Sequence, residues 1–352
     1  MRSIKRVGSG LLGALILVAL SAAPTVACGG LIGPNGAVNL LRTTTFAGYH
    51  EGVEHYVTSF EFAGGGGSFG SLTPLPGVPT SVEKGGDWTL QRLRIETEPQ
   101  LDRFFAVGAD AAPAASAEVL MEVTIDALDI TVLRGGAAEV GEWARDHGFR
   151  LPPDAPEVLE FYAARSEIFL AAAFDGAAAA ARGQNVGDGT PVHITIPTDN
   201  PWVPLRILAL GKTGSEVIEA DVYLLTDQAP AILPAPDGFN GMILDHSRPA
   251  GESLLADLRS DRGMEWIPDT AWLTKIALDG TAAQFGFDLA IDASGANVPS
   301  RVAAGLDLPG AVDPTIAAAT RWLVAMAFMI GGVGSIMFLI GHRPTVGGPQ
   351  VA

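Results

Sequence analysis

The chain has 352 residues, and its 39 acidic and 22 basic side chains give it a formal net charge of −17. An acidic surface repels phosphate backbones and anionic headgroups, so we expect neither nucleic acid binding nor peripheral lipid binding. The length allows one large domain or two ordinary ones, and the single cysteine excludes an intramolecular disulfide.

Residues 1–27 have the form of a secretory signal peptide. Basic residues precede an apolar run over 7–20, and small residues follow it up to Ala27. We expect cleavage between Ala27 and Cys28 and therefore an exported domain. Cys28 is then either acylated, as in a lipoprotein, or a free thiol near the new N-terminus.

A β-hairpin is predicted next, from strands over 37–49 and 55–62 with a glycine in the turn. His50 and His55 flank this turn, and Glu51 and Glu54 lie between them. The two histidines are five apart, whereas a helical zinc-protease motif needs them four apart. They form either a two-histidine surface site for a metal or exposed neighbours on adjacent strands.

Residues 64–67 are all glycine and residues 73–79 are rich in proline, so we expect a loop or an irregular edge there and not a central strand. Ser68 has the Gly-x-Ser-x-Gly spelling of a hydrolase nucleophile elbow, but no helix is predicted after it, as that motif requires. Residues 88–95 are predicted to be extended, and 111–115 to be a weakly structured connector.

The middle of the chain mixes strands with helices. Residues 119–133 predict one long strand or two short ones, and helices are expected from Ala137 to about Gly148 and from Asp154 onward. His147 falls in the last turn of the first helix, where a cation meets the negative end of the helix dipole. A third helix is expected over 253–262, and further strands over 168–174, 192–196, 205–210, 217–225, 272–278 and 285–291.

These elements contain no repeating strand–helix–strand rhythm. They predict an α+β class, with a β-rich and largely antiparallel sheet into which two or three helices are inserted. The exported domain is expected to cover residues 28–312, with candidate seams near 108–117 and 229–241.

A candidate ligand loop lies within residues 197–206. Its prolines make it stiff, Trp202 offers a large flat contact, and Arg206 offers a fork of donors suited to carboxylates. Asp199 and Asn200 add polar groups at its start. The alternative is a structural loop, in which Trp202 packs on the core and Arg206 pairs with an acid of the domain.

Residues 322–340 form the second apolar segment, 19 residues without a charge. At about 1.5 Å per residue a helix of this length spans a bilayer core, so we expect a single C-terminal transmembrane helix. Gly331, Gly334 and Ser335 give it a small-residue face on which another helix can pack. Residues 313–321 are expected to be juxtamembrane, and 341–352 to be a short cytoplasmic tail.

The chain resembles an uncharacterised bacterial family known as domain of unknown function 2330. The likeness rests on Ala27 to Gly30, on Trp143 with residues 148–152, on 159–162, and on 191–197 through Arg206. The resemblance implies export and, in members like this one, a C-terminal anchor. It implies no activity, cofactor or site residue.

The expected function is therefore that of a cell-envelope protein anchored in the membrane, whose exported domain binds a ligand or partner and is not an enzyme. No cofactor or metal is expected. Two alternative functions stay open. The protein is either an envelope hydrolase that uses paired carboxylates or an accessory subunit that packs into a membrane complex through its span.

Overall fold

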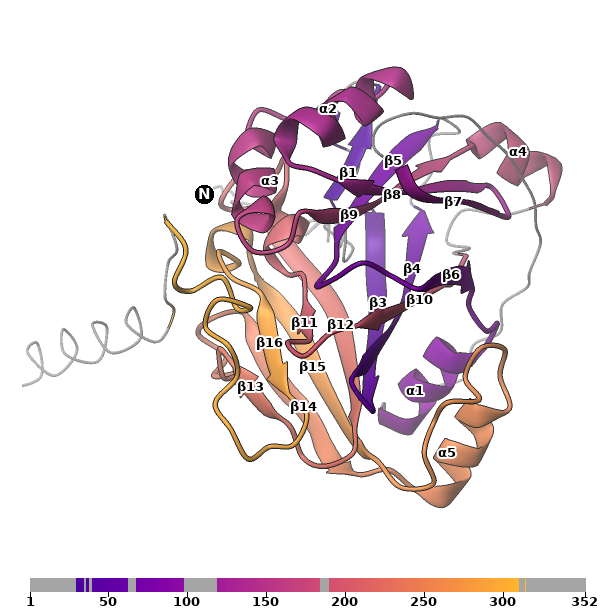
Figure 1. Ribbon diagram of the computed structural model, residues 1–352, viewed down its shortest axis with the longest axis vertical. Helices are drawn as coiled ribbons and strands as arrows, with labels where there is room; N and C mark the ends of the chain where they lie inside the picture. The colour runs from indigo at the N-terminus through magenta and orange to yellow at the C-terminus, as the bar shows by residue number, and fades with distance from the viewer. Residues whose placement is uncertain are drawn as a thin grey trace, which may run out of the picture.

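The computed structural model describes residues 30–34, 36–37, 40–62, 68–97, 119–183, 190–309 and 314. These residues form a six-stranded, a seven-stranded and a three-stranded sheet, together with a few helices (Figure 1). The β-rich, mostly antiparallel architecture that the sequence predicts is confirmed.

The six-stranded sheet has the order β2-β1-β5-β9-β8-β7, and all its pairs are antiparallel. Two helices that follow β8 in the chain pack against each other beside this sheet (Figure 1). The strands are β1 (Gly30–Gly33), β2 (Gly36–Ala37), β5 (Phe69–Pro74), β7 (Val119–Ile125), β8 (Leu128–Arg134) and β9 (Ile168–Phe174). The helices of this part are α2 (Ala137–Asp146), α3 (Ala155–Ala163) and the short α4 (Gly176–Ala181).

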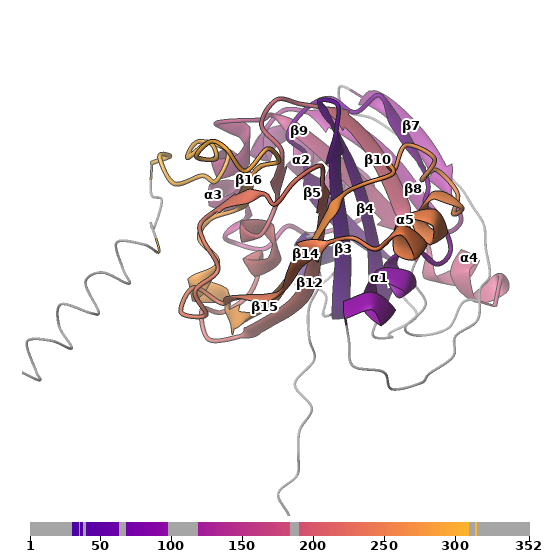
Figure 2. The ribbon, with the colours of Figure 1, turned by 90° about the horizontal axis from the view of Figure 1, so that it is seen from below.

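The seven-stranded sheet has the order β14-β15-β12-β3-β4-β10-β6, in which β12 and β3 run parallel and the other described pairs are antiparallel. Its strands are β3 (Leu40–His50), β4 (Val53–Phe62), β6 (Ser81–Lys84), β10 (Val192–Pro197), β12 (Val217–Thr226), β14 (Met242–Pro249) and β15 (Trp272–Thr281). Helices α1 (Thr89–Thr97) and α5 (Glu252–Arg259) lie together beside β3 and β4 (Figure 2).

The smallest sheet joins β11 (Trp202–Val203), β16 (Leu289–Asp292) and β13 (Ala231–Leu233), all antiparallel. Two 3₁₀ turns complete the described elements, η1 (Arg206–Ala209) and η2 (Ala282–Gln284).

Both faces of the seven-stranded sheet are buried, because successive side chains of a strand point to opposite sides. On β4 and β12, Tyr56 and Val222 belong to the large core that continues into the six-stranded sheet. Val57 and Tyr223 belong instead to a smaller core with residues of α1 and α5. We call the first side the inner face and the second the outer face.

Several local predictions are confirmed. The hairpin consists of β3 and β4, and its two-residue turn holds Glu51 and Gly52 at φ values of 49° and 80°. Positive φ at both turn positions is typical of a tight type I′ hairpin turn. The three predicted helices are α2, α3 and α5, and residues 119–133 form two strands.

The extended structure predicted for 88–95 is wrong, because these residues begin α1. The first turn of α1 receives its cap from far along the chain. The Asp261 carboxylate accepts hydrogen bonds from the amides of Trp88 and Thr89 and from the Thr89 hydroxyl, at 3.2, 2.8 and 2.7 Å. A cap supplied by tertiary structure leaves no local sequence signal.

The strand predicted over 205–210 is also wrong, since these residues form η1. The strand predicted over 285–291 is reduced to β16, which begins at Leu289. Residues 73–79 were expected to avoid a central strand, yet Thr73 and Pro74 end β5, which lies between β1 and β9. Proline is tolerated there because it stands at the last position of the strand.

No helix within the described residues is long and apolar enough to cross a membrane. The expected signal peptide, the span at 322–340 and the candidate seam at 108–117 all lie outside the described residues.

Candidate functional site

The hairpin of β3 and β4 places a carboxyl group inside the large core. The register sets Glu54 opposite Tyr49, and both side chains point to the inner face. Glu54 is completely buried, and neither of its carboxyl oxygens has a hydrogen-bond partner of ordinary length and angle. Burial raises the pKa of Glu54 to about 8, although a hydrogen bond from the Trp202 backbone, longer or less well aligned than usual, acts in the opposite direction. At neutral pH Glu54 is therefore a neutral acid that can donate one hydrogen bond and accept others.

Glu54 begins a line of polar side chains along the inner face. We call this line the polar stripe; it comprises Thr43 and Thr45 of β3 and Glu54, Tyr56 and Thr58 of β4, all buried. Thr45 and Thr58 are directly opposite each other in the register. The hydroxyls of Thr43, Thr45 and Thr58 have no hydrogen-bond partner. Unpaired buried hydroxyls also occur at Thr274 of β15 and at Ser71 and Thr73 of β5.

Such a stripe is costly unless something bonds to it. Each buried polar group without a partner costs about 1–3 kcal/mol, so Glu54 and the three threonines together cost roughly 4–12 kcal/mol. A domain is stable by only about 5–15 kcal/mol in total. Unpaired groups on this scale mark a place where water or a ligand satisfies them.

The candidate ligand loop adjoins the open end of this stripe. The Tyr49 hydroxyl donates to the carbonyl of Thr198 at 2.8 Å, and the Thr198 amide donates to the carbonyl of Gly52 at 3.0 Å. Asp199 and Asn200 are exposed at the tip of the loop. Burial and the charges of Asp199, Glu54 and Asp292 together raise the pKa of Tyr49, so these acids lie near the phenol.

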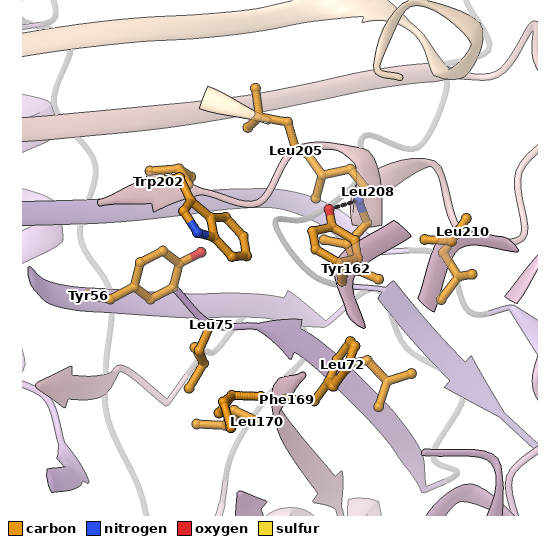
Figure 3. Close-up of a cluster of buried hydrophobic side chains, with 14 of the residues drawn as sticks. Tyr56, Leu72, Leu75, Tyr162, Phe169, Leu170, Trp202, Leu205, Leu208 and Leu210 are labelled. Carbon is orange, nitrogen blue, oxygen red and sulfur yellow. Dashed lines mark hydrogen bonds between the residues drawn. The ribbon is translucent and has the colours of Figure 1, made fainter. Parts of the chain in front are cut away.

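Trp202 and Arg206 point inward. Trp202 stacks on Tyr162 with ring centroids 5.8 Å apart, within the core where the Tyr56 hydroxyl points toward it (Figure 3). Arg206 lies over the Phe161 ring and donates to the Glu157 carboxylate at 2.5 Å. Trp202 and Arg206 therefore make the contacts expected of a structural loop, one with the core and one with an acid of the domain. Asp199 and Asn200 are exposed and stay available to a ligand.

A buried ion pair fixes the base of this loop. Asp288 is completely buried and accepts hydrogen bonds from the amides of Leu205 and Arg206, from the Tyr162 hydroxyl and from Arg165. The Arg165 guanidinium also lies 4.3 Å from the centroid of the Trp202 ring. The two amides that bind Asp288 begin η1, so the carboxylate sets the path of the chain after Trp202.

Comparison with known proteins gives a family but no activity. The family model for DUF2330, described as an uncharacterized protein conserved in bacteria, matches residues 23–242. The chain belongs to this family. No functionally curated protein matches it.

Two solved structures share a low similarity with this DUF2330 protein. A mutated baculovirus P35 after caspase cleavage is 9% identical, over 71% of this chain and 99% of that one, with a TM-score of 0.35. A second structure of baculovirus P35 is 10% identical, over 72% of this chain and 90% of that one, with a TM-score of 0.33. Both scores are too low to support an argument about fold or function.

The matched DUF2330 region contains the whole polar stripe and the ligand loop, whereas Asp288 follows it. Sequence reasoning had treated Glu54 as a turn acid and had not considered Arg165 or Asp288. Strand alternation could have placed Glu54 beside Tyr56 and Thr58 on one face. No local pattern marks Arg165 and Asp288 as partners, because they lie 123 residues apart.

The remaining predicted residues are dispersed. His50 and His55 are not opposite each other; His50 contacts Asp227 at 2.7 Å, and His55 stacks on Trp266. Ser68 is exposed and a strand follows it. No group of three or more His, Cys, Asp or Glu side chains in the described ranges is arranged to hold a metal ion. Ala27, Cys28, Gly331, Gly334 and Ser335 lie outside the described residues.

Proposed function

We propose that this DUF2330 protein is an exported cell-envelope protein, tethered by residues 322–340, whose domain binds a small uncharged polar molecule through the polar stripe. The observation that carries the proposal is the set of buried hydroxyls without a partner on Thr43, Thr45 and Thr58, next to the Glu54 carboxyl, which has no hydrogen bond of ordinary length and angle. The apolar segments at the two ends of the chain support the location.

The chemistry of the stripe selects the class of ligand. Each hydroxyl donates and accepts, and the neutral Glu54 carboxyl does both as well. A charged ligand would lose its hydration in this core without meeting an opposite charge in the stripe, which is expensive. A short glycan or a polyol, with many hydroxyls and no charge, fits these groups best.

One observation favours the hydrolase alternative. Glu54 is a neutral acid at pH 7, and the carboxylates of Asp199 and Asp292 lie near the same tyrosine. This resembles the pairing of an acid with a base in glycoside hydrolysis. However, burial raises the pKa of Asp292 less than the hydrogen bonds from Asn297 and Ser294 lower it, so this pKa lies below the usual value. A carboxylate with a lowered pKa is a weaker base. We therefore place binding first.

The binding test uses the full chain in detergent and a panel of uncharged saccharides and polyols. Thermal unfolding should shift upward with at least one of them. In the double variant Thr45→Val, Thr58→Val, which keeps side-chain shape, affinity should fall about thirtyfold, since each lost hydrogen bond is worth about 1 kcal/mol. The exposed Thr124 supplies the control Thr124→Val, which should bind like the wild type.

An equal shift in the double variant and the wild type would rule out the stripe as the binding site. If the bound compound is also cleaved, and Glu54→Gln abolishes cleavage while it preserves binding, the hydrolase alternative replaces the binding one.

The accessory-subunit alternative has its own test. Partners recovered with the intact chain but not with a chain that ends at residue 312 would assign a role to the span beyond tethering. Identical partners from both would leave the span as a tether.

A further inference from the structure

Two histidines from adjacent strands meet on the outer face of the seven-stranded sheet. His55 of β4 and His193 of β10 occupy diagonal positions in the antiparallel register. The Nδ1 atom of His55 lies 3.1 Å from the Nε2 atom of His193. The sequence pattern does not predict this contact, because 138 positions separate the two histidines. They lie away from the polar stripe, which is on the opposite face of the same sheet.

The surroundings hold the two rings in place. Trp266 stacks on His55 with centroids 3.9 Å apart and planes 7° from parallel. It occupies the space above Gly48 of β3, where a Cβ atom would come within 2.1 Å of the tryptophan ring. The backbone at Gly263 approaches the other side of His193. Packed residues therefore enclose the pair from both sides.

The surroundings keep both imidazoles neutral. Burial lowers the pKa of His193, and it lowers that of His55 to about 3, with help from the charges of His193 and His50. Both imidazoles are thus neutral at pH 7 and keep a lone pair for a ligand bond. The charges of Glu83 and Glu265 act against this lowering at His193, so these two carboxylates lie near enough to offset part of the charge of a bound ion.

The distance between the two nitrogens suits a shared metal ion. Two imidazole nitrogens that each lie about 2.0–2.1 Å from one ion are about 2.9–3.4 Å apart for ligand angles between 90° and tetrahedral. The observed 3.1 Å falls within this interval. Since the described residues offer no group of three ligands, water must complete the coordination. Glu83 then acts through its charge; its carboxylate is held by a 2.7 Å hydrogen bond from the Ser81 hydroxyl.

We propose that His55 and His193 bind one divalent transition-metal ion through the two nitrogens that face each other. In the present contact one of these nitrogens must carry a proton. Binding needs only that this proton move to the far nitrogen of the same ring, so that each imidazole stays neutral. Among the available ions, Cu²⁺ should bind most tightly, because imidazole sites follow the Irving–Williams order.

The test is a Cu²⁺ titration of the full chain in detergent, followed by electron paramagnetic resonance. The wild type should bind one Cu²⁺ whose spectrum shows coupling to two imidazole nitrogens. His55→Gln and His193→Gln should each remove one of the two couplings and weaken binding by about tenfold or more. Glu83→Gln should weaken binding and retain both couplings. Because His193 is buried, the half-buried His55 provides the variant that is better tolerated by the fold.

His147→Gln is the matched control. His147 ends α2, where its ring stacks on Trp143 and bonds to that residue's carbonyl oxygen, so the variant should leave the spectrum and affinity unchanged. The proposal is overturned if the wild type binds no Cu²⁺, or if His55→Gln gives the same spectrum and affinity as the wild type.

Discussion

At the scale of single residues, the buried carboxyl of Glu54 makes a distinct contribution to how stability responds to pH. Burial raises its pKa from the ordinary value of 4.5 to about 8 in the folded chain. Between these two values the folded state binds a proton that the unfolded state has released. The contribution of Glu54 to stability is therefore fully present below about pH 4.5 and is lost as the pH rises toward 8.

The wild type should lose about 1.4 kcal/mol of stability per pH unit relative to Glu54→Gln between pH 5 and pH 8. Thermal unfolding of the full chain in detergent at pH 5, 6, 7 and 8 measures this difference. Glu51→Gln, at the exposed turn of the same hairpin, should follow the wild type. Parallel curves for the wild type and Glu54→Gln would show that Glu54 is charged in the folded state.

A second residue-scale prediction concerns the pair of Arg165 and Asp288. Asp288→Asn removes the charge that compensates the buried guanidinium, and such a loss typically costs about 3–5 kcal/mol. Unfolding in urea should show a decrease of that size. Asp307→Asn breaks the exposed pair with Arg301 and should cost at most about 1 kcal/mol. Similar values for both variants would contradict the structural role given to Asp288.

Most of the residues chosen from the sequence as a ligand loop do lie together, but they point in different directions. Asp199 and Asn200 are exposed, whereas Trp202 is in the core and Arg206 is paired with Glu157. Composition reveals which side chains can bind a ligand, but only packing decides which of them face outward. The polar stripe was missed for the opposite reason, because its threonines are ordinary strand residues until their burial is known.

At the scale of elements, the sequence predicts those that carry their own signals. The Gly52 turn, the acid and proline at the start of α3, and the leucines of α5 are local features. By contrast, α1 and η1 both begin at amides that donate hydrogen bonds to an aspartate far away in the chain. Their sequences are compatible with strands, and tertiary hydrogen bonds decide the outcome.

This dependence gives a prediction for α1. Asp261→Ala removes the carboxylate that accepts hydrogen bonds from the amides of Trp88 and Thr89 and from the Thr89 hydroxyl. The variant should therefore lose about 2 kcal/mol of stability. Asp257→Ala, which lies nearby in α5 and breaks a half-exposed pair with Arg92, should change stability by no more than about 0.5 kcal/mol. Hydrogen exchange should also become faster in α1 for Asp261→Ala alone. Unchanged exchange there would mean that α1 does not need this cap.

At the scale of the whole molecule, composition and pattern were sufficient for the β-rich, mostly antiparallel class, and the resemblance of several motifs indicated the DUF2330 family. They could not give the strand order, because the parallel pairing of β12 with β3 joins segments far apart in the chain. Export and anchoring remain proposals that rest on the two terminal apolar segments. The central claim is that the core between the sheets holds a polar molecule.

A high-resolution crystal structure of the detergent-solubilised full chain tests this claim most directly. We expect ordered density within hydrogen-bonding distance of the Glu54 carboxyl and of the Thr45 and Thr58 hydroxyls, with the shape of an uncharged polar compound. A core without such density, in which these side chains turn to bond one another or the backbone, would contradict the account.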